Sequence, residues 1–309
     1  MEILHKLKII QQLTGKTQET LARELGVSFV AFNSWINGKS QPRARAIKRI
    51  DALFAGLIGT ARQEADVLIT KKSIITARQR SHQNILKMIL NNPDIRDNFL
   101  LALTYHTNRI EGSTVTKDET AAIMFDNATF KSRTLTEQLE VKNHQAALWY
   151  LFGYISEKRP VNEQLIIRLH EILLNGIHSE AGLYRRHGVR IVGANVPTAN
   201  YLKVPVLMRR LSSDLLKTGR DLIAQVSRIH AQFEQIHPFA DGNGRVGRLL
   251  LNAQLLAKNL PPAVIEQKNR RMYMKSLNIA QVEDDYGQLE DFLCDAVLKG
   301  FQILERHGG

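Results

Sequence analysis

A histidine and an aspartate stand four residues apart at the start of the stretch HPFADGNGRVGR, in the C-terminal half of the chain. His237 has the side-chain type whose ordinary pKa lets it accept a proton near neutral pH. Asp241 offers a hard carboxylate oxygen, suited to Mg²⁺ that is held mainly by phosphates and water. The pair indicates proton transfer beside a metal-bound polyanion.

The rest of the stretch is suited to holding an anion. Gly242, Asn243 and Gly244 can adopt positive φ and bring backbone N–H groups close to a phosphate. They lead into an apolar helical pattern, and the N-terminus of a helix favours negative charge. Arg245 and Arg248 share one helix face, where two guanidinium forks can hold two successive phosphates. A hydroxyl attacking a bound nucleotide polyphosphate is therefore favoured over an ordinary capped turn.

The elements that position these residues are predicted to be helical almost throughout, so the expected fold class is all-α. Amphipathic periods predict helices at 94–107, 117–127, 134–158, 162–176, 204–217, 219–236, 244–258, 269–282 and 286–306. One stretch, 188–205, is β-branched with Gly and Pro and predicts a β-hairpin. Such an element is suited to a lid or a substrate clamp.

Composition is that of a globular protein of about two domains. Of the 309 residues, 44% are hydrophobic and 23% charged, and the longest apolar run, 146–155, is too short to span a membrane. The N-terminus lacks a signal-peptide pattern and Cys294 is the single cysteine, which excludes a disulfide framework. We expect a cytoplasmic protein without membrane partners.

The net charge of +12 is uneven, because residues 1–62 hold ten Lys/Arg against four acids. Within this basic segment, Gly26 ends one short helical pattern and Ser28 is a good N-cap for the next. The letters Q-x-x-L-A-x-x-x-G-V-S followed by W-x-x-G-K-x-x-P resemble the repressor-type helix-turn-helix family over roughly residues 4–55. The resemblance implies a DNA-binding head, and a docking or dimerisation module is the alternative.

In that family, the first exposed residues of the second helix meet base edges. The corresponding region supplies the candidate DNA contacts Gln18, Ser28, Phe29, Asn33, Ser34 and Lys39, with Val30 also at the helix start. Phe and Val cannot make bidentate hydrogen bonds to bases, although they can meet a thymine methyl. Heads of this type often act as dimers, which is compatible with a homodimer.

The stretch HPFADGNGRVGR also resembles the Fic domain signature H-P-F-x-x-G-N-G-R-x-x-R at every fixed position. The resemblance covers about residues 94–300 and implies a helical bundle with a β-hairpin flap. Its activity would be that of a protein adenylyltransferase, which moves AMP from ATP to a hydroxyl of a target protein or of the chain itself. The domain organisation we predict is a head at 1–60, a helical connector at 61–93 and a Fic domain at 94–309.

Individual roles follow from this resemblance. His237 would be the general base, Asp241 would hold Mg²⁺, and the ATP phosphates would lie on Gly242, Asn243, Gly244, Arg245 and Arg248. The flap at 188–205 would clamp the target by strand addition and place Val192, Gly193 and Ala194 beside the nucleotide. Tyr273 and Met274 fall where the family lines the adenine pocket.

A second motif, TNRIEG, resembles the family's inhibitory pattern [S/T]-x-x-x-E-G, here placed N-terminal to the signature. Its fixed residues are Thr107, Glu111 and Gly112, and the resemblance pairs Glu111 with Arg248. A carboxylate on Arg248 would remove the fork meant for the γ-phosphate, so the enzyme would be autoinhibited. Two alternatives stay open, a hydrolase that removes AMP from modified proteins and a transcriptional regulator that uses a Fic fold to sense a ligand.

Overall fold

The computed structural model describes residues 3–14, 16–190, 196–217, 219 and 221–305. The chain divides into an N-terminal unit, Met1–Ile69, and a C-terminal unit, Thr70–Gly309, with the division falling inside helix α4 (Ala44–Ser81). The described residues form helices and no strand, so the predicted all-helical fold class is confirmed for them. No helix among them is long and apolar enough to cross a membrane.

The N-terminal unit consists of α1 (Ile3–Thr14), α2 (Gln18–Glu24), α3 (Phe29–Ile36) and the first part of α4. Thr17 and Ser28 begin α2 and α3 by accepting hydrogen bonds from backbone N–H groups three residues ahead. Gly26 lies between these helices at φ +64°, a conformation that favours glycine. Gly26 therefore follows the end of the first short helix and Ser28 caps the second, as the sequence predicts.

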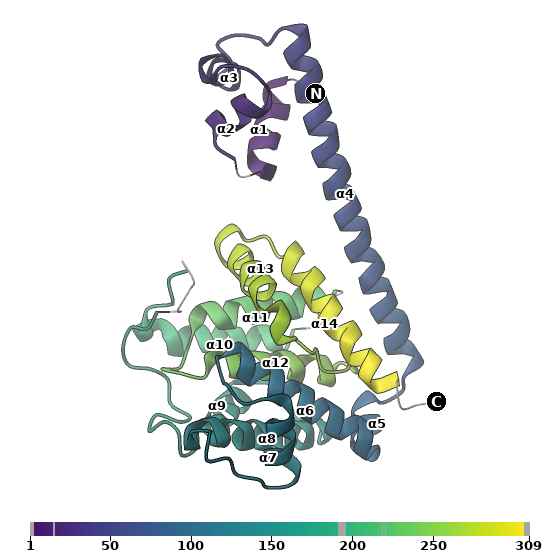
Figure 1. Cartoon of the computed structure of the whole chain (residues 1–309), viewed down its shortest axis with the longest axis vertical. Coiled ribbons are helices and arrows are strands. Elements are labelled where there is room, and N and C mark those ends of the chain that lie inside the picture. Colours follow the sequence, from purple (N-terminus) through teal and green to yellow (C-terminus); the bar gives the residue numbers. More distant parts are fainter. Residues whose placement is uncertain (1–2, 15, 191–195, 218, 220, 306–309) are drawn as a thin grey trace. The chain divides into compact units, whose positions relative to one another are not determined.

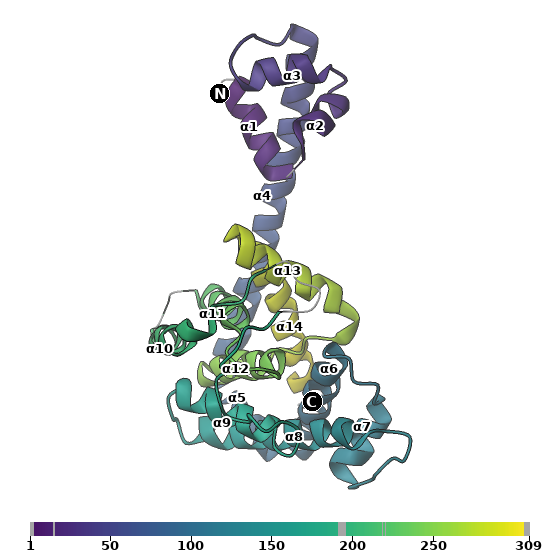
Figure 2. The ribbon, with the colours of Figure 1, turned by 90° about the vertical axis from the view of Figure 1, so that its left-hand side faces the viewer.

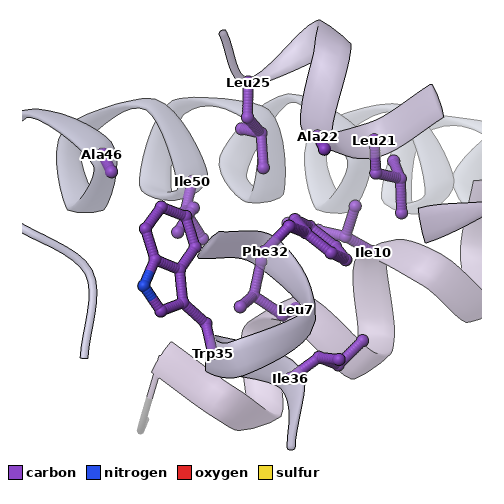
Figure 3. Packing of buried hydrophobic residues seen from close by; sticks show 10 residues of the cluster. All are labelled: Leu7, Ile10, Leu21, Ala22, Leu25, Phe32, Trp35, Ile36, Ala46 and Ile50. Atoms are coloured by element: carbon purple, nitrogen blue, oxygen red, sulfur yellow. The ribbon is translucent and has the colours of Figure 1, made fainter. Parts of the chain in front are cut away.

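This unit has its own hydrophobic core, shown in Figure 3. Phe32 is fully buried at its centre, and Trp35 packs there from the same helix. The other buried side chains come from all four helices and are Leu7, Ile10, Leu21, Ala22, Leu25, Ile36, Ala46 and Ile50. The core around α2 and α3 is therefore completed by α1 and α4.

Within the described residues, the C-terminal unit contains the rest of α4 and ten further α-helices, α5 to α14 (Figure 1). Their bounds are α5 (Ile85–Asn91), α6 (Pro93–Ile110), α7 (Lys117–Phe125), α8 (Leu135–Ser156), α9 (Glu163–Leu173), α10 (Val204–Leu215), α11 (Leu222–Ile236), α12 (Asn243–Ala257), α13 (Arg270–Glu283) and α14 (Gly287–Glu305). Two 3₁₀ turns, Tyr201–Lys203 and Gln267–Asn269, precede α10 and α13. The stretch expected as a connector holds the end of α4 and all of α5.

Local sequence signals explain where several of these helices begin. Thr116 and Thr134 each form a capping box with the glutamate three residues later, at the starts of α7 and α8. Pro93 occupies the first turn of α6, where its missing N–H is harmless, and Asn92 caps that helix. Thr116 thus begins α7 shortly after Glu111, the residue that caps the end of α6.

Helix α12 is the centre of the C-terminal unit. It packs against α11, α9, α8 and α6, and Figures 1 and 2 both show it among these helices. From Asn243 to Leu256 every residue except Gly244 is buried. A helix buried on all sides carries apolar residues around its whole circumference, as LLLNAQLLA does here. The two arginines of the signature are therefore part of the core.

The predicted hairpin at 188–205 requires correction at its C-terminal end. Tyr201–Lys203 form a 3₁₀ turn and α10 begins at Val204, because Asn200 caps the turn and Pro205 suits a first helical turn. Residues 188–190 and 196–200 have no strand, although Thr198 Oγ1 donates a 2.8 Å hydrogen bond to Val189 O across the stretch. Residues 191–195 lie outside the described residues.

Candidate nucleotide-binding site

His237 stands at the C-terminal end of α11 in a left-handed conformation, with φ 50° and ψ 62°. Its Nδ1 lies 3.1 Å from the carbonyl oxygen of Glu234, which can only accept a hydrogen bond, so Nδ1 carries the proton in the neutral ring. The lone pair of Nε2 is then available as a base. Burial holds the pKa of His237 below its ordinary value, and the cation of Arg185 adds to the effect.

The loop after His237 is closed by one side chain. Asn243 Oδ1 accepts from Phe239 N and Asn243 Nδ2 donates to Phe239 O, both at 2.9 Å in buried surroundings. Gly242 between them has φ +75°, and a methyl group there would collide with Leu174. The loop therefore needs both residues to lead the backbone into the N-terminus of α12, whose first amides are unpaired within the helix.

His170 fixes the same loop from α9. Its Nδ1 accepts from Gly182 N at 2.9 Å, so the neutral ring donates from Nε2 to the carbonyl of Asp241 at 3.1 Å. Burial lowers the pKa of His170 to about 4, and the ring stacks on Phe239 with centroids 3.7 Å apart. His170 is thus a neutral support beneath Asp241.

Asp241 points toward solvent, with its side chain 61% exposed. Its Oδ1 accepts from Gly242 N at 2.6 Å and its Oδ2 lies 3.6 Å from Arg245 Nη2. No group of three His, Cys, Asp or Glu side chains that could hold a metal occurs among the described residues. One accessible carboxylate fits Mg²⁺ that takes most of its ligands from phosphates and water, and it does not fit a site built from protein ligands alone.

Arg245 is buried on α12 and paired with Glu140 of α8, whose Oε1 lies 2.7 Å from Arg245 Nη1. Burial raises the pKa of Glu140, while Arg245 opposes the rise. This pair holds the guanidinium beside Asp241. The sequence analysis did not identify Glu140.

Arg248 is held by two side chains of the TNRIEG motif, Thr107 and Glu111. Its Nε donates to Thr107 Oγ1 at 2.5 Å and its Nη2 donates to Glu111 Oε1 at 2.5 Å. Glu111 caps the end of α6, and its carboxylate lies so close to Gly244 that a methyl group there would collide with it. Gly112 follows at φ +102°, which ends the helix. A negative group therefore already occupies the N-terminal turn of α12 and the fork of Arg248.

Further polar groups are buried behind Arg248. Burial raises the pKa of Glu234 to about 7, with Arg248 opposing the rise, so this carboxyl titrates near neutral pH. His230 Nε2 and the Tyr273 hydroxyl lie 2.7 Å apart, and burial lowers the pKa of His230 to about 3. These groups surround the guanidinium with neutral or weakly acidic partners.

The structure does not bring every predicted site residue together. Tyr273 is 1% exposed, so contact with adenine would require this side chain to be uncovered, and Met274 beside it is half-buried. Val192, Gly193 and Ala194 lie outside the described residues. The roles of all these residues stay predictions.

The residues proposed to contact DNA lie in the N-terminal unit. Asn33 Nδ2 donates to Gln18 Oε1 at 2.9 Å, which links α3 to α2, and the hydroxyls of Ser34 and Ser40 lie 2.7 Å apart. Ser28 is used as the N-cap of α3. Phe29, the first residue of α3, is 49% exposed, and Lys39 beyond the helix is exposed too.

Three charged residues near the site were missed: Arg185 and Glu234, which are buried, and Glu140, which is partly buried. A signal existed for Glu234, because it lies on the buried face of α11, four residues after His230, where an acid is unusual. Arg185 and Glu140 carry no such signal, since their contacts join segments that are far apart in the sequence.

Comparison with known proteins agrees with this geometry. Residues 160–255 match the model of the Fic/DOC family. The protein adenylyltransferase Fic of Drosophila ananassae is 30% identical over 203 residues, which is 64% of this chain and 40% of that protein, so the chain spans less than half of such relatives.

Solved structures show the same fold. Fic-1 from C. elegans superposes with a TM-score of 0.66 at 22% identity, covering 93% of this chain and 84% of that one. A Fic family protein from Desulfovibrio desulfuricans gives a TM-score of 0.62 at 25% identity, covering 77% of this chain and 74% of its own. The signature, the family match and the fold thus agree in making residues 160–255 of this chain similar to the Fic/DOC family.

Proposed function

We propose that the C-terminal unit is a protein adenylyltransferase, which transfers AMP from ATP to a hydroxyl side chain of a target protein or of the chain itself. One observation carries this proposal: His237 has Nε2 available as a base at the loop that opens onto the N-terminus of α12. The names of the relatives support it, because they are protein adenylyltransferases.

The proposed reaction uses the site as follows. The ATP phosphates lie on the amides at the start of α12, with Arg245 and Arg248 as their guanidinium partners. The target hydroxyl attacks the α-phosphorus while its proton passes to His237 Nε2. The bond from the α-phosphorus to the bridging oxygen breaks, and pyrophosphate leaves. Mg²⁺ bound at Asp241 would neutralise charge on the phosphates.

We propose further that the enzyme is autoinhibited by Glu111. The carboxylate takes one fork position of Arg248 and lies against Gly244, so it opposes a γ-phosphate both by charge and by space. ATP that binds in its presence would lack the Arg248 contact and the alignment for in-line attack.

The position of the label tests the reaction type. The Glu111→Gly chain is incubated with Mg²⁺, a lysate of the source organism, and ATP labelled on either the α- or the γ-phosphate. We expect the α label to become covalently attached to protein and the γ label to leave with pyrophosphate. Incorporation of the γ label alone would indicate a kinase, and no incorporation of either label would refute the proposal.

For the N-terminal unit we propose DNA binding through α3. Phe29 and Val30 are exposed at its start, at 49% and 76%, and apolar side chains there suit thymine methyl groups. The exposed cations Lys39, Arg43 and Arg45 follow, which suits contact with phosphates.

A gel-shift titration of the full chain on genomic fragments tests this proposal. The binding constant should fall steeply as salt rises, with a logarithmic slope of about −0.9 for each phosphate neutralised. Arg43→Gln should lower the slope by about one phosphate contact. Lys87→Gln, a change of the same charge on the exposed surface of α5, is the control and should leave the slope unchanged. A chain that binds no fragment even at low salt would show that the unit has another role.

A further inference from the structure

Arg185 is a buried cation next to the site, and the mechanism above does not use it. Arg185 is 2% exposed, and no carboxylate of the described residues lies within ion-pair distance of its guanidinium group. Burial lowers the pKa of Arg185. Buried arginines are normally paired with an acid, because removing an unpaired charge from water is costly. Backbone carbonyl groups take the place of a counter-ion around Arg185.

One side of Arg185 binds the catalytic loop. Its Nε donates to His237 O at 2.7 Å, its Nη2 donates to Ile236 O at 3.3 Å, and its backbone N–H donates to Pro238 O at 3.0 Å. These three consecutive carbonyls belong to the last residue of α11 and the two residues after it, where a helix leaves its last carbonyls without partners. A cation is also favoured there by the helix dipole.

The other side of Arg185 binds the segment that precedes α10. Its Nη1 donates to His187 O at 2.8 Å and its Nη2 donates to Ala199 O at 2.5 Å. Ala199 N in turn donates to Gln235 O at 3.3 Å. One guanidinium thus joins two points, twelve residues apart in the sequence, to the loop that carries His237.

The conformation of His237 needs such support. A non-glycine residue at φ 50° is in a backbone conformation that L side chains disfavour, and it persists only where its surroundings hold it. This backbone conformation, together with the bond from Nδ1 to Glu234 O, decides where Nε2 points.

We propose that Arg185 is a positioning residue for the general base, which holds His237 in its left-handed conformation and fastens the segment before α10, at His187 and Ala199, to the same loop. This inference rests on the proposed role of His237. Nothing about Arg185 places it in contact with ATP or with the transferred group, so it acts through His237.

The charge of Arg185 has a second, separable effect. The groups that act on His237 are Arg185, Glu111, Asp241 and the carbonyl of Glu234, and after burial itself Arg185 is the main influence that lowers the pKa of His237. A base with a lowered pKa is already deprotonated at neutral pH, so activity should decline only at acid pH. Loss of the cation should move this acid limb to higher pH, toward the ordinary value of about 6.5.

Two substitutions separate position from charge, both made in the Glu111→Gly chain. Arg185→Lys keeps the charge but a single ammonium cannot reach the carbonyls that the fork joins, whereas Arg185→Gln removes both. We expect kcat to fall about 10- to 100-fold in each, because a displacement of about 1 Å is enough for such a loss. The KM for ATP should stay unchanged, since the phosphate-binding residues are untouched. The pH at which activity declines on the acid side should move clearly upward in Arg185→Gln and less in Arg185→Lys.

The control is Arg186→Gln, which removes the same charge from the exposed neighbouring residue and should change neither kcat nor the acid limb. Titration of the His237 ring by NMR gives its pKa without any activity. If Arg185→Gln does not fold, Arg185→Lys decides.

Wild-type kcat and an unmoved His237 pKa in a folded Arg185 variant would overturn this inference and leave the proposed function standing. Failure of the proposed function would instead appear as no incorporation of the α label by the Glu111→Gly parent, a result that leaves the NMR titration of His237 readable. The two failures are therefore distinguishable.

Discussion

Replacement of Glu111 by glycine should raise the rate of AMP incorporation by about 10-fold or more, which corresponds to an activation free energy lower by about 1.4 kcal/mol. The variant frees the Arg248 fork and clears the carboxylate from Gly244, so the γ-phosphate can take the place that Glu111 Oε1 holds. The measurement is the initial rate of α-labelled incorporation at saturating ATP, with ATP affinity determined separately by calorimetry.

Glu157→Gly is a matched control for this change. Glu157 also caps the C-terminus of a helix, α8, and its carboxylate contacts only Arg159, at 3.6 Å, among the described ion pairs. We expect its rate to equal that of the wild type. If Glu111→Gly were no faster than this control, Glu111 would be a structural partner of Arg248 and the autoinhibition proposal would be wrong.

Replacement of His237 by alanine in the Glu111→Gly chain should lower AMP transfer by about 100- to 10,000-fold, the usual contribution of a general base. No other described side chain combines a free basic nitrogen with this place beside the α12 N-terminus. ATP affinity should change little, because the amides of α12 and the two arginines remain. Single-turnover transfer and ATP binding, measured on the same preparation, check both statements.

His82→Gln serves as the control, since His82 contacts Arg78 and Phe301 and none of the residues assigned to the site. Its rate should match that of its parent. Transfer that survives in His237→Ala at a rate within a few-fold of the parent would remove His237 from the role of base and would require another proton acceptor.

The sequence predicted the helices well because long amphipathic periods and capping residues are local signals. The helix expected at 134–158 is α8, Leu135–Ser156. It begins with a capping box of Thr134 and Glu137, a pattern that can be recognised from the amino-acid sequence alone. Residues 201–205 were predicted wrongly because β-branched and Pro-containing letters also suit a capped turn followed by a helix start.

Features that depend on contacts between distant segments could not be predicted in this way. Arg185 donates to backbone carbonyls more than fifty residues ahead in the sequence. Because every residue has a backbone carbonyl, the amino-acid sequence does not indicate which of them a buried arginine will bind. Glu140 is 105 residues from Arg245, and an acid on an amphipathic helix usually faces solvent. The Glu111–Arg248 pair was suggested only because the family resemblance linked two motifs that local chemistry does not connect.

The burial of α12 has a consequence for anyone who edits this protein. The helix that carries Arg245 and Arg248 is also the helix on which the surrounding helices pack. A substitution along it therefore changes both the stability of the fold and the contacts to the nucleotide. Most random substitutions in this helix would therefore abolish activity by unfolding the protein, and such variants say nothing about catalysis. Residues at the rim, such as Asp241 and Glu111, are exposed enough to be changed for their chemistry alone, and a mutational map of activity should begin with them.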